Sequence, residues 1–149
     1  MGFVLKTING DLFNATVSLA HCVGADFKMG MGIAVKFRDL FGQVDYLKNQ
    51  KVQSGGCAVL KVNNPDRFIY YLVTKPATAP GILPTYESLE SSLRAMREHM
   101  LANEVKKIAM PQIGCGLDKL QWNEVEQRLR NIFEKDDVEI NVYVYSPPK

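Results

Sequence analysis

The segment Met110-Pro111-Gln112-Ile113-Gly114-Cys115-Gly116-Leu117-Asp118 decides how this sequence is interpreted. It completes a short apolar run, Lys107–Met110, which is typical of the end of a buried strand, and a helical pattern follows it. A strand that ends in a glycine-rich loop before a helix can direct several backbone N–H groups at one anion. Gly114 and Gly116 permit close approach of the backbone, and Asp118 at the far end is placed for acid–base chemistry. The segment therefore predicts a phosphate cradle beside an ionisable group, which fits a nucleotide-like ligand.

Composition and charge describe an ordinary globular chain. The 149 residues fit one domain, 1–149, and 46% hydrophobic residues allow a sizeable core. The 18 Lys and Arg against 16 Asp and Glu leave a net charge of +2, too balanced for broad, non-specific nucleic-acid binding. The three cysteines form no CxxC pair, which favours free thiols over a disulfide framework or a zinc site. No apolar run reaches the length of a membrane span, and the N-terminus lacks a signal peptide's apolar core. We therefore expect a nuclear or cytoplasmic monomer.

Strand-like and helix-like patterns alternate along the chain. Strands are expected over Phe3–Ile8, Val17–Val23, Cys57–Val62, Phe68–Thr74, Lys107–Met110 and Val138–Tyr145. Helices are expected over Gly30–Phe41, Val44–Gln50, Tyr86–Asn103 and Trp122–Phe133. The turn residues Asn63–Asp66 predict a hairpin, and Thr85 is a plausible helix N-cap. This order predicts a three-layer α/β/α domain with a mixed, largely buried central sheet.

A second glycine cluster, Lys28–Ala34, also follows an expected strand and opens an expected helix. It is neither a Walker A loop nor a complete dinucleotide fingerprint, because Lys36 stands near the third glycine position. Alone, such a cluster is more often a tight turn. Two clusters at strand ends favour a shared phosphate site.

Two charged residues at expected strand ends have two interpretations each. Asp11 follows the Asn9–Gly10 turn and is either a turn or N-cap carboxylate or an acceptor for an adenine amine; local sequence favours the former. Lys75 follows the apolar strand Phe68–Thr74. A partly desolvated lysine there could attack a carbonyl-like carbon while Asp118 moves protons. Local sequence alone favours a structural role for Lys75.

The histidines, cysteines and last tyrosines give weaker signals. His21 lies in an apolar run, which favours a buried, hydrogen-bonded side chain, and no ligands stand at metal-site spacing. Cys115 could have a lowered pKa in its loop, but a cysteine nucleophile would need His21 or His99 as base, and His99 is expected in solvent on a helix. Tyr143 and Tyr145 alternate on the last strand, where core packing is the default and adenine stacking the alternative. The sequence therefore predicts neither a metal nor a cofactor.

Taken together, these residues resemble the macrodomain family, the ADP-ribose-binding α/β/α fold. More narrowly, they are similar to its terminal ADP-ribose protein glycohydrolase branch, also known for O-acyl-ADP-ribose deacylase activity. The similarity extends from Asn9–Phe13 to Val142–Tyr143. Its further segments are Ser18–Cys22, Met29–Val35, Tyr70–Lys75, Pro84–Glu87, Met110–Asp118 and Leu120–Trp122.

The resemblance implies a role for each matching residue. Lys75 would be the nucleophile that attacks the anomeric carbon of the distal ribose and forms a lysyl–ADP-ribose intermediate, and Asp118 the acid/base that resolves it. The residues implied to bind ADP-ribose are Asp11, Leu12, Gly24, Gly30, Met31, Gly32, Ile33, Thr74, Gln112, Ile113, Gly114, Cys115, Gly116, Leu117, Tyr143 and Tyr145. The implied activity is removal of ADP-ribose from acidic side chains of modified proteins, together with deacylation of O-acyl-ADP-ribose. A non-catalytic ADP-ribose reader and a hydrolase of ADP-ribosylated nucleic-acid bases remain the alternatives.

The sequence also departs from the family pattern in three places. His21–Gly24 replaces the Asn-Ala-Ala-Asn segment of most macrodomains, as is usual in this branch. Pro76 and the longer loop Ala77–Leu83 follow Lys75, which raises the question of how far that lysine can move. Tyr145 stands where a leucine is expected, so packing at the adenine side is expected to differ.

Overall fold

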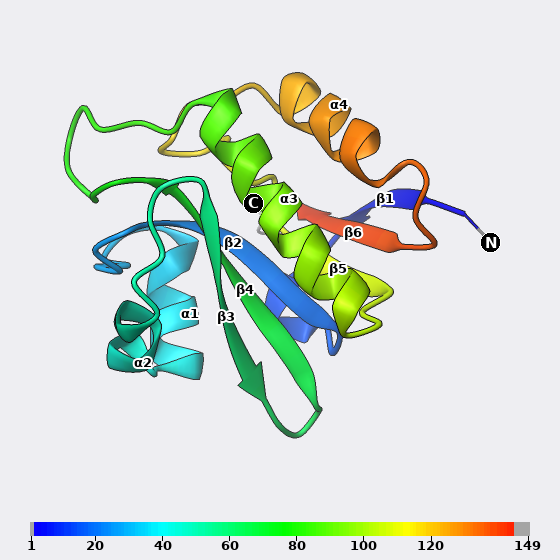
Figure 1. The fold of residues 1–149 in the computed structure, drawn as a ribbon, viewed down its shortest axis with the longest axis horizontal. Helices are drawn as coiled ribbons and strands as arrows, with labels where there is room; N and C mark the ends of the chain where they lie inside the picture. The colour runs from blue at the N-terminus through cyan, green and yellow to red at the C-terminus, as the bar shows by residue number, and fades with distance from the viewer. Residues whose placement is uncertain (1, 145–149) are drawn as a thin grey trace.

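A computed structural model describes residues 2–144 of the chain. The strands are β1 (Val4–Asn9), β2 (Ser18–Gly24), β3 (Gly56–Val62), β4 (Arg67–Lys75), β5 (Lys107–Met110) and β6 (Glu139–Val144). The helices are α1 (Ile33–Phe41), α2 (Val44–Asn49), α3 (Tyr86–Ala102) and α4 (Trp122–Phe133), with a short 3-10 helix, η1, at Leu12–Asn14. Every expected strand and helix is present, with ends that either match or differ by at most three residues (Figure 1).

The strands form one mixed sheet in the order β1-β6-β5-β2-β4-β3. All neighbours are parallel except β3 and β4, which form the predicted antiparallel hairpin. Because parallel strands point the same way, five of the six strands end at the same edge of the sheet. That edge is where ligands bind in open α/β sheets.

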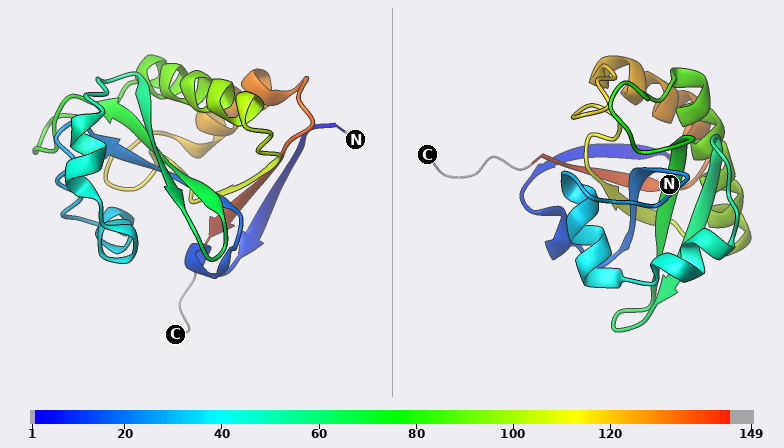
Figure 2. Two further views of the ribbon diagram at one scale, coloured as in Figure 1. Left: turned by 60° about the horizontal axis from the view of Figure 1, so that its bottom comes forward. Right: turned by 90° about the vertical axis from the view of Figure 1, so that its left-hand side faces the viewer.

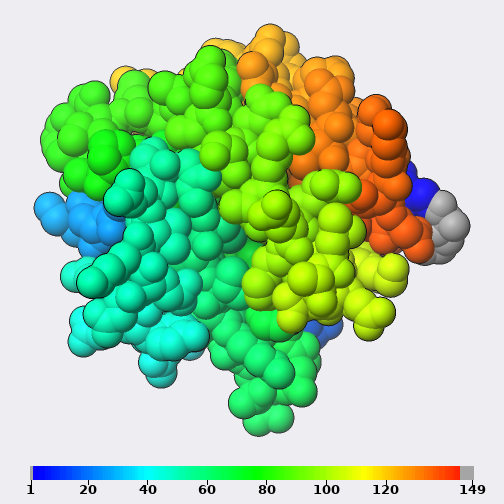
Figure 3. All heavy atoms as spheres, viewed as in Figure 1, coloured from blue at the N-terminus to red at the C-terminus, as the bar shows by residue number. Residues whose placement is uncertain are grey.

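Helices cover both faces of the sheet, as predicted. Side chains of β4 alternate between two cores: Tyr70 and Leu72 pack with α3 and α4, whereas Tyr71 and Val73 pack with α1 and α2. Figure 2 shows the two pairs of helices on opposite sides of the sheet. The space-filling view shows the atoms of α3 and α4 in contact along one face (Figure 3). The arrangement is therefore a three-layer α/β/α fold.

The structure differs from the sequence expectation at the loops that matter most. Helix α1 begins at Ile33 rather than Gly30, because Gly32 adopts a positive φ of 62° that a helix cannot continue through. Helix α4 begins at Trp122, as expected. The 3-10 helix η1 was not predicted. The first glycine loop is thus longer than the sequence pattern indicates.

Within residues 2–144, the helices are too short or too polar for any of them to traverse a lipid bilayer.

Candidate active site

Loops from four parts of the chain meet at the carboxyl edge of the sheet. They follow β1, β2, β4 and β5, and they contain, in that order, Asp11, the Gly30–Gly32 cluster, Lys75 and the Gly114–Asp118 loop. Strands β1 and β6 come from opposite ends of the chain but pair in parallel, which brings Tyr143 to the same edge. The fold therefore gathers the predicted site residues that lie within the described part of the chain.

Lys75 and Asp118 form an ion pair at this edge. Lys75 Nζ lies 2.7 Å from Asp118 Oδ1, and the two side chains are only 14% and 16% exposed. Lys75 is the last residue of β4, and Asp118 comes from the loop after β5. Strand β2 lies between these two strands, so the pair reaches across the end of β2. A largely buried ammonium and carboxylate in direct contact can exchange a proton without a mediating water.

The carboxyl end of β4 is held by hydroxyl groups of helix α3. The Ser88 hydroxyl donates a 2.6 Å hydrogen bond to the Thr74 carbonyl, and the Ser92 hydroxyl donates one of 2.9 Å to Val73. Thr85 and Ser88 also form a reciprocal capping box at the start of α3. The predicted N-cap is therefore confirmed, and its partner Ser88, which the sequence interpretation missed, anchors the residue before Lys75. The Thr-x-x-Ser spacing was the available signal.

The loop that carries Asp118 is closed on itself. Gly114 has a positive φ of 74°, and the Leu120 N–H donates a 2.7 Å hydrogen bond to its carbonyl. A Cβ on Gly114 would lie 2.8 Å from Leu120 Cδ1, so a larger residue would displace the loop. The Gln121 N–H donates to the Tyr86 hydroxyl at 3.0 Å. These contacts set the direction in which Asp118 points.

The two glycine clusters lie against each other, as the idea of a shared phosphate site requires. A Cβ on Gly32 would be 3.8 Å from Leu117 Cδ1 of the other cluster. Met31 and Leu117 are 64% and 62% exposed, so two large apolar side chains stand at the rim. The backbones of both clusters are thus close enough for their N–H groups to donate to the same anion.

At the other end of this edge, Asp11 has the structural role that local sequence favoured. It caps η1, with Oδ1 accepting a 3.0 Å hydrogen bond from the Phe13 N–H, while Oδ2 lies 3.8 Å from Lys36 Nζ. Leu12 is buried, and the half-buried Tyr143 ring lies 4.0 Å from the position of a Cβ on Gly10. Tyr145 lies outside the described residues.

Comparison with known proteins identifies this arrangement. Residues 20–129 match the Macro domain family. The chain belongs to that family. It is 49% identical, over 95% of its length, to the human protein named ADP-ribose glycohydrolase OARD1, of which it covers 92%. It is 28% identical to the DNA ADP-ribosyl glycohydrolase of Mycobacterium tuberculosis, over 91% of this chain and 40% of that protein. Among solved structures, the macrodomain of Thermus aquaticus DarG superposes with a TM-score of 0.83 at 28% identity, covering 96% of this chain and 99% of that one.

The contacts of the two histidines in this macrodomain differ from expectation. His21 is fully buried, as predicted, but neither ring nitrogen has a hydrogen-bond partner among residues 2–144. It stacks on Phe37 at 3.7 Å instead, and burial lowers the pKa of its imidazole to about 3. His99 is not in free solvent: its Nδ1 lies 2.8 Å from the Tyr70 hydroxyl, and burial lowers its pKa. Both rings pack among aromatic side chains, which sequence periodicity cannot reveal.

Cys115 is not an activated thiol. Burial raises the pKa of its thiol above the ordinary value, contrary to the lowering that its loop position suggested, and its Sγ donates to the Ile113 carbonyl at 3.3 Å. Cys22 shares this raised pKa for the same reason, with the Asp118 charge adding to it. Both thiols are therefore protonated at neutral pH. Among the described residues, no group of three or more His, Cys, Asp or Glu is placed to hold a metal ion.

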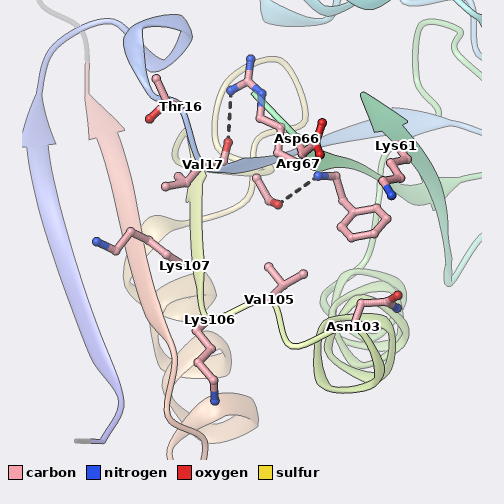
Figure 4. A pocket seen from close by; sticks show the side chains of 11 residues that line it. Thr16, Val17, Lys61, Asp66, Arg67, Asn103, Val105, Lys106 and Lys107 are labelled. Carbon is pink, nitrogen blue, oxygen red and sulfur yellow. Dashed lines mark hydrogen bonds between the residues drawn. The ribbon is translucent and has the colours of Figure 1, made fainter. Parts of the chain in front are cut away.

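A cleft of about 570 Å³ lies at the opposite end of the sheet (Figure 4). Four cationic residues line it: Lys61, Arg67, Lys106 and Lys107. It contains none of the predicted site residues and is separated from them by the length of β2, roughly 20 Å for seven residues. The cleft therefore takes no part in the chemistry at Lys75.

Proposed function

We propose that this macrodomain is a hydrolase that removes ADP-ribose from acidic side chains of modified proteins through a covalent lysyl–ADP-ribose intermediate. The observation that carries the proposal is the Lys75–Asp118 pair, 2.7 Å apart and largely shielded, beside two abutting glycine loops. Simple binding of ADP-ribose needs no such pair. The similarity to proteins named ADP-ribose glycohydrolase supports the same conclusion.

The two glycine loops suit the diphosphate of ADP-ribose. Backbone N–H groups around Gly30–Gly32 and Gly114–Gly116 can donate to phosphate oxygens from both sides. Asp11, Leu12 and Tyr143 lie at the β1–β6 end of the same edge, where the adenosine half would extend. The distal ribose would then lie at Lys75. A solved structure of Thermosipho africanus DarTG contains ADP-ribose, which is consistent with this ligand class for the fold.

The first chemical step begins with the ion pair. Bound substrate excludes water, which disfavours two adjacent charges, so the Lys75 ammonium passes a proton to the Asp118 carboxylate. The neutral amine then attacks the anomeric carbon of the distal ribose. A C–N bond forms, the C–O bond to the modified side chain breaks, and that side chain leaves as a carboxylate with the bonding electron pair.

The second step returns the enzyme to its starting state. Asp118 first releases to solvent the proton that it received from Lys75, and as a carboxylate it then takes a proton from water while the water oxygen bonds to the same anomeric carbon. The C–N bond breaks with its electron pair returning to the nitrogen, Asp118 passes the proton taken from water to the Lys75 amine, and free ADP-ribose is released. In O-acyl-ADP-ribose the acyl group is an ester of a ribose hydroxyl, so attack of Lys75 at the anomeric carbon would not release it. Deacylation therefore requires Asp118 to direct water at the acyl carbonyl instead.

A single substitution tests the role of Lys75. An auto-modified ADP-ribosyltransferase is incubated with wild type, Lys75→Ala and the exposed control Lys135→Ala. We expect release of ADP-ribose from wild type and the control only, while calorimetry shows ADP-ribose binding by all three. Borohydride trapping followed by mass spectrometry should place the adduct on Lys75. Equal release by wild type and Lys75→Ala, or an adduct elsewhere, would overturn the mechanism.

A second candidate substrate is favoured by one comparison. The relatives in Mycobacterium tuberculosis and Thermus aquaticus are named DNA ADP-ribosyl glycohydrolases. An ADP-ribosylated oligonucleotide, offered in competition with the modified protein, distinguishes the two substrate classes. Tight ADP-ribose binding with no turnover of either substrate would instead indicate a reader.

A further inference from the structure

The chain folds back immediately after Lys75 and packs on the end of β2. Gly24 pairs with Lys75 in the sheet, after an irregularity in register at Val23. A Cβ on Gly24 would lie 2.6 Å from Thr78 Oγ1 and 3.0 Å from the backbone of Ala77. Only a residue without a side chain fits there. The segment that follows Lys75 is therefore pressed against the neighbouring strand.

One carboxylate holds this segment in place. Asp26 Oδ2 accepts a 2.7 Å hydrogen bond from the Thr78 N–H, and Asp26 Oδ1 accepts one of 2.8 Å from the Thr78 hydroxyl. Burial alone would raise the pKa of the Asp26 carboxyl, but the hydrogen bonds from Thr78 and Lys28 outweigh it and hold the pKa below its usual range. Hydrogen bonds to a charged acceptor are stronger than those between neutral groups. Asp26 and Thr78 thus form a two-point clamp.

The clamp divides the loop after Lys75 into two parts. Residues 76–77 lie between the last residue of β4 and the clamp, and the Lys75 carbonyl accepts a further hydrogen bond from the Ala25 N–H at 3.0 Å. Beyond the clamp, residues 79–81 are exposed and the chain turns through Gly81 at a positive φ of 83°. Figure 1 shows this part projecting from the molecule before α3 begins. The clamp therefore prevents movement of residues 79–81 from displacing Lys75.

We propose that Asp26 is a positioning residue for Lys75, acting through Thr78 to aim the amine at the reacting carbon and keep it beside Asp118. The proposal rests on the proposed function and names a residue that need not touch the substrate itself. Ser88 holds the backbone on one side of Lys75, and the Asp26 clamp holds it on the other. A displacement of about 1 Å at a nucleophile can cost about 100-fold in rate. Pro76 and the longer loop raise the question of how far Lys75 can move. The clamp limits that movement, because it anchors the loop at its third residue.

The test compares variants that remove one or both arms of the clamp. Asp26→Ala removes both, Thr78→Val removes the hydroxyl arm, and Thr78→Ser keeps both and serves as the rescue. Asp137→Asn, an exposed aspartate after α4, is the matched control. We expect kcat for ADP-ribose release to fall about 10- to 100-fold in Asp26→Ala and less in Thr78→Val. KM and the calorimetric affinity for ADP-ribose should stay at the wild-type value in every variant, and Thr78→Ser should match wild type.

A second readout does not depend on turnover. Trace labelling with acetic anhydride, followed by mass spectrometry, reports how often the Lys75 amine leaves Asp118. We expect faster labelling of Lys75 in Asp26→Ala than in wild type, with unchanged labelling of the exposed Lys135. If wild type shows no turnover while the labelling differs as expected, the proposed function fails and the positioning role stands. Unchanged labelling and kcat in folded Asp26→Ala would overturn the proposal, as would a loss of ADP-ribose affinity equal to the loss of rate.

Discussion

The Tyr86 hydroxyl accepts a hydrogen bond from the Gln121 N–H at 3.0 Å, which joins the first turn of α3 to the loop that carries Asp118. Helix α3 thereby contacts the two segments that carry the candidate catalytic pair, since Ser88 of the same turn holds the residue before Lys75. The start of one helix therefore sets the relative position of two loops that come from different strands.

Tyr86→Phe should slow the reaction without unfolding the protein. The ring would remain, with its cation–π contact to the Arg128 guanidinium at 4.4 Å, and only the hydrogen bond would be lost. We expect a loss of about 1 kcal/mol in unfolding free energy. The rate of ADP-ribose release should fall about 10-fold. Steady-state kinetics and urea denaturation measure the two effects, and Tyr46→Phe on the exposed face of α2 is the control. A rate equal to wild type would show that this contact does not position Asp118.

Asp118→Asn should abolish most turnover and keep binding. The amide cannot take the Lys75 proton, so the amine stays charged and general acid–base catalysis is lost, an effect of about 10²- to 10⁴-fold. Release of ADP-ribose from a modified protein and calorimetry with ADP-ribose provide the two measurements. Asp66→Asn, at the other end of the sheet, should behave as wild type. Retention of more than a tenth of the wild-type rate would remove Asp118 from the mechanism.

Two glycines should respond to alanine in different ways. At Gly24 the new methyl would meet Thr78 Oγ1 at 2.6 Å, so we expect a loss of about 1–3 kcal/mol in stability, with lower activity. At Gly30 no atom lies within 4 Å of the new Cβ, so stability should not change. Affinity for ADP-ribose should nevertheless fall in Gly30→Ala, because the methyl would crowd a bound diphosphate. Thermal denaturation and calorimetry separate the two outcomes, and equal stability of both variants would contradict the packing argument at Gly24.

Stability should decrease as the pH falls below 6.5. In the folded chain the pKa of His21 is about 3, against 6.5 for an unperturbed histidine, so the unfolded chain binds a proton that the folded chain does not. The contribution of His21 is complete above pH 6.5 and is lost progressively between pH 6.5 and about 3. In this range the protonation of His21 lowers the free energy of unfolding by at most about 1.4 kcal/mol for each pH unit. His99, whose pKa is also lowered by burial, adds to the slope in the same direction.

His21→Phe is the variant that checks this pH dependence. Phenylalanine keeps the stacking on Phe37 and removes two buried nitrogens that have no partner among residues 2–144. We expect the variant to be at least as stable as wild type at about pH 7.5 and clearly more stable at about pH 4.5. Urea midpoints at the two pH values provide the comparison. If the urea midpoints of wild type and variant fall by the same amount between the two pH values, groups other than His21 cause the acid sensitivity.

Local patterns in the sequence predict the elements, because each helix and strand has its own periodicity. Trp122–Phe133 has the predicted bounds, since its apolar residues repeat at helical spacing and its other positions are polar. The clamp and the Tyr86 contact have no local signal. Asp26 and Thr78 are 52 residues apart, and Tyr86 and Gln121 are 35 apart, so neither partner identifies the other. The Lys75–Asp118 pair was predicted only through family resemblance, because local sequence favoured a structural role for Lys75.

The position of β2 between β4 and β5 has a consequence for folding experiments. Lys75 and Asp118 can meet only after three strands from separate parts of the chain have assembled in parallel. A partly folded chain with only the β3–β4 hairpin and α3 in place would carry the lysine without its carboxylate. Return of the reactive amine–carboxylate pair during refolding is therefore a reporter of sheet completion, and it should lag behind the appearance of helical circular dichroism.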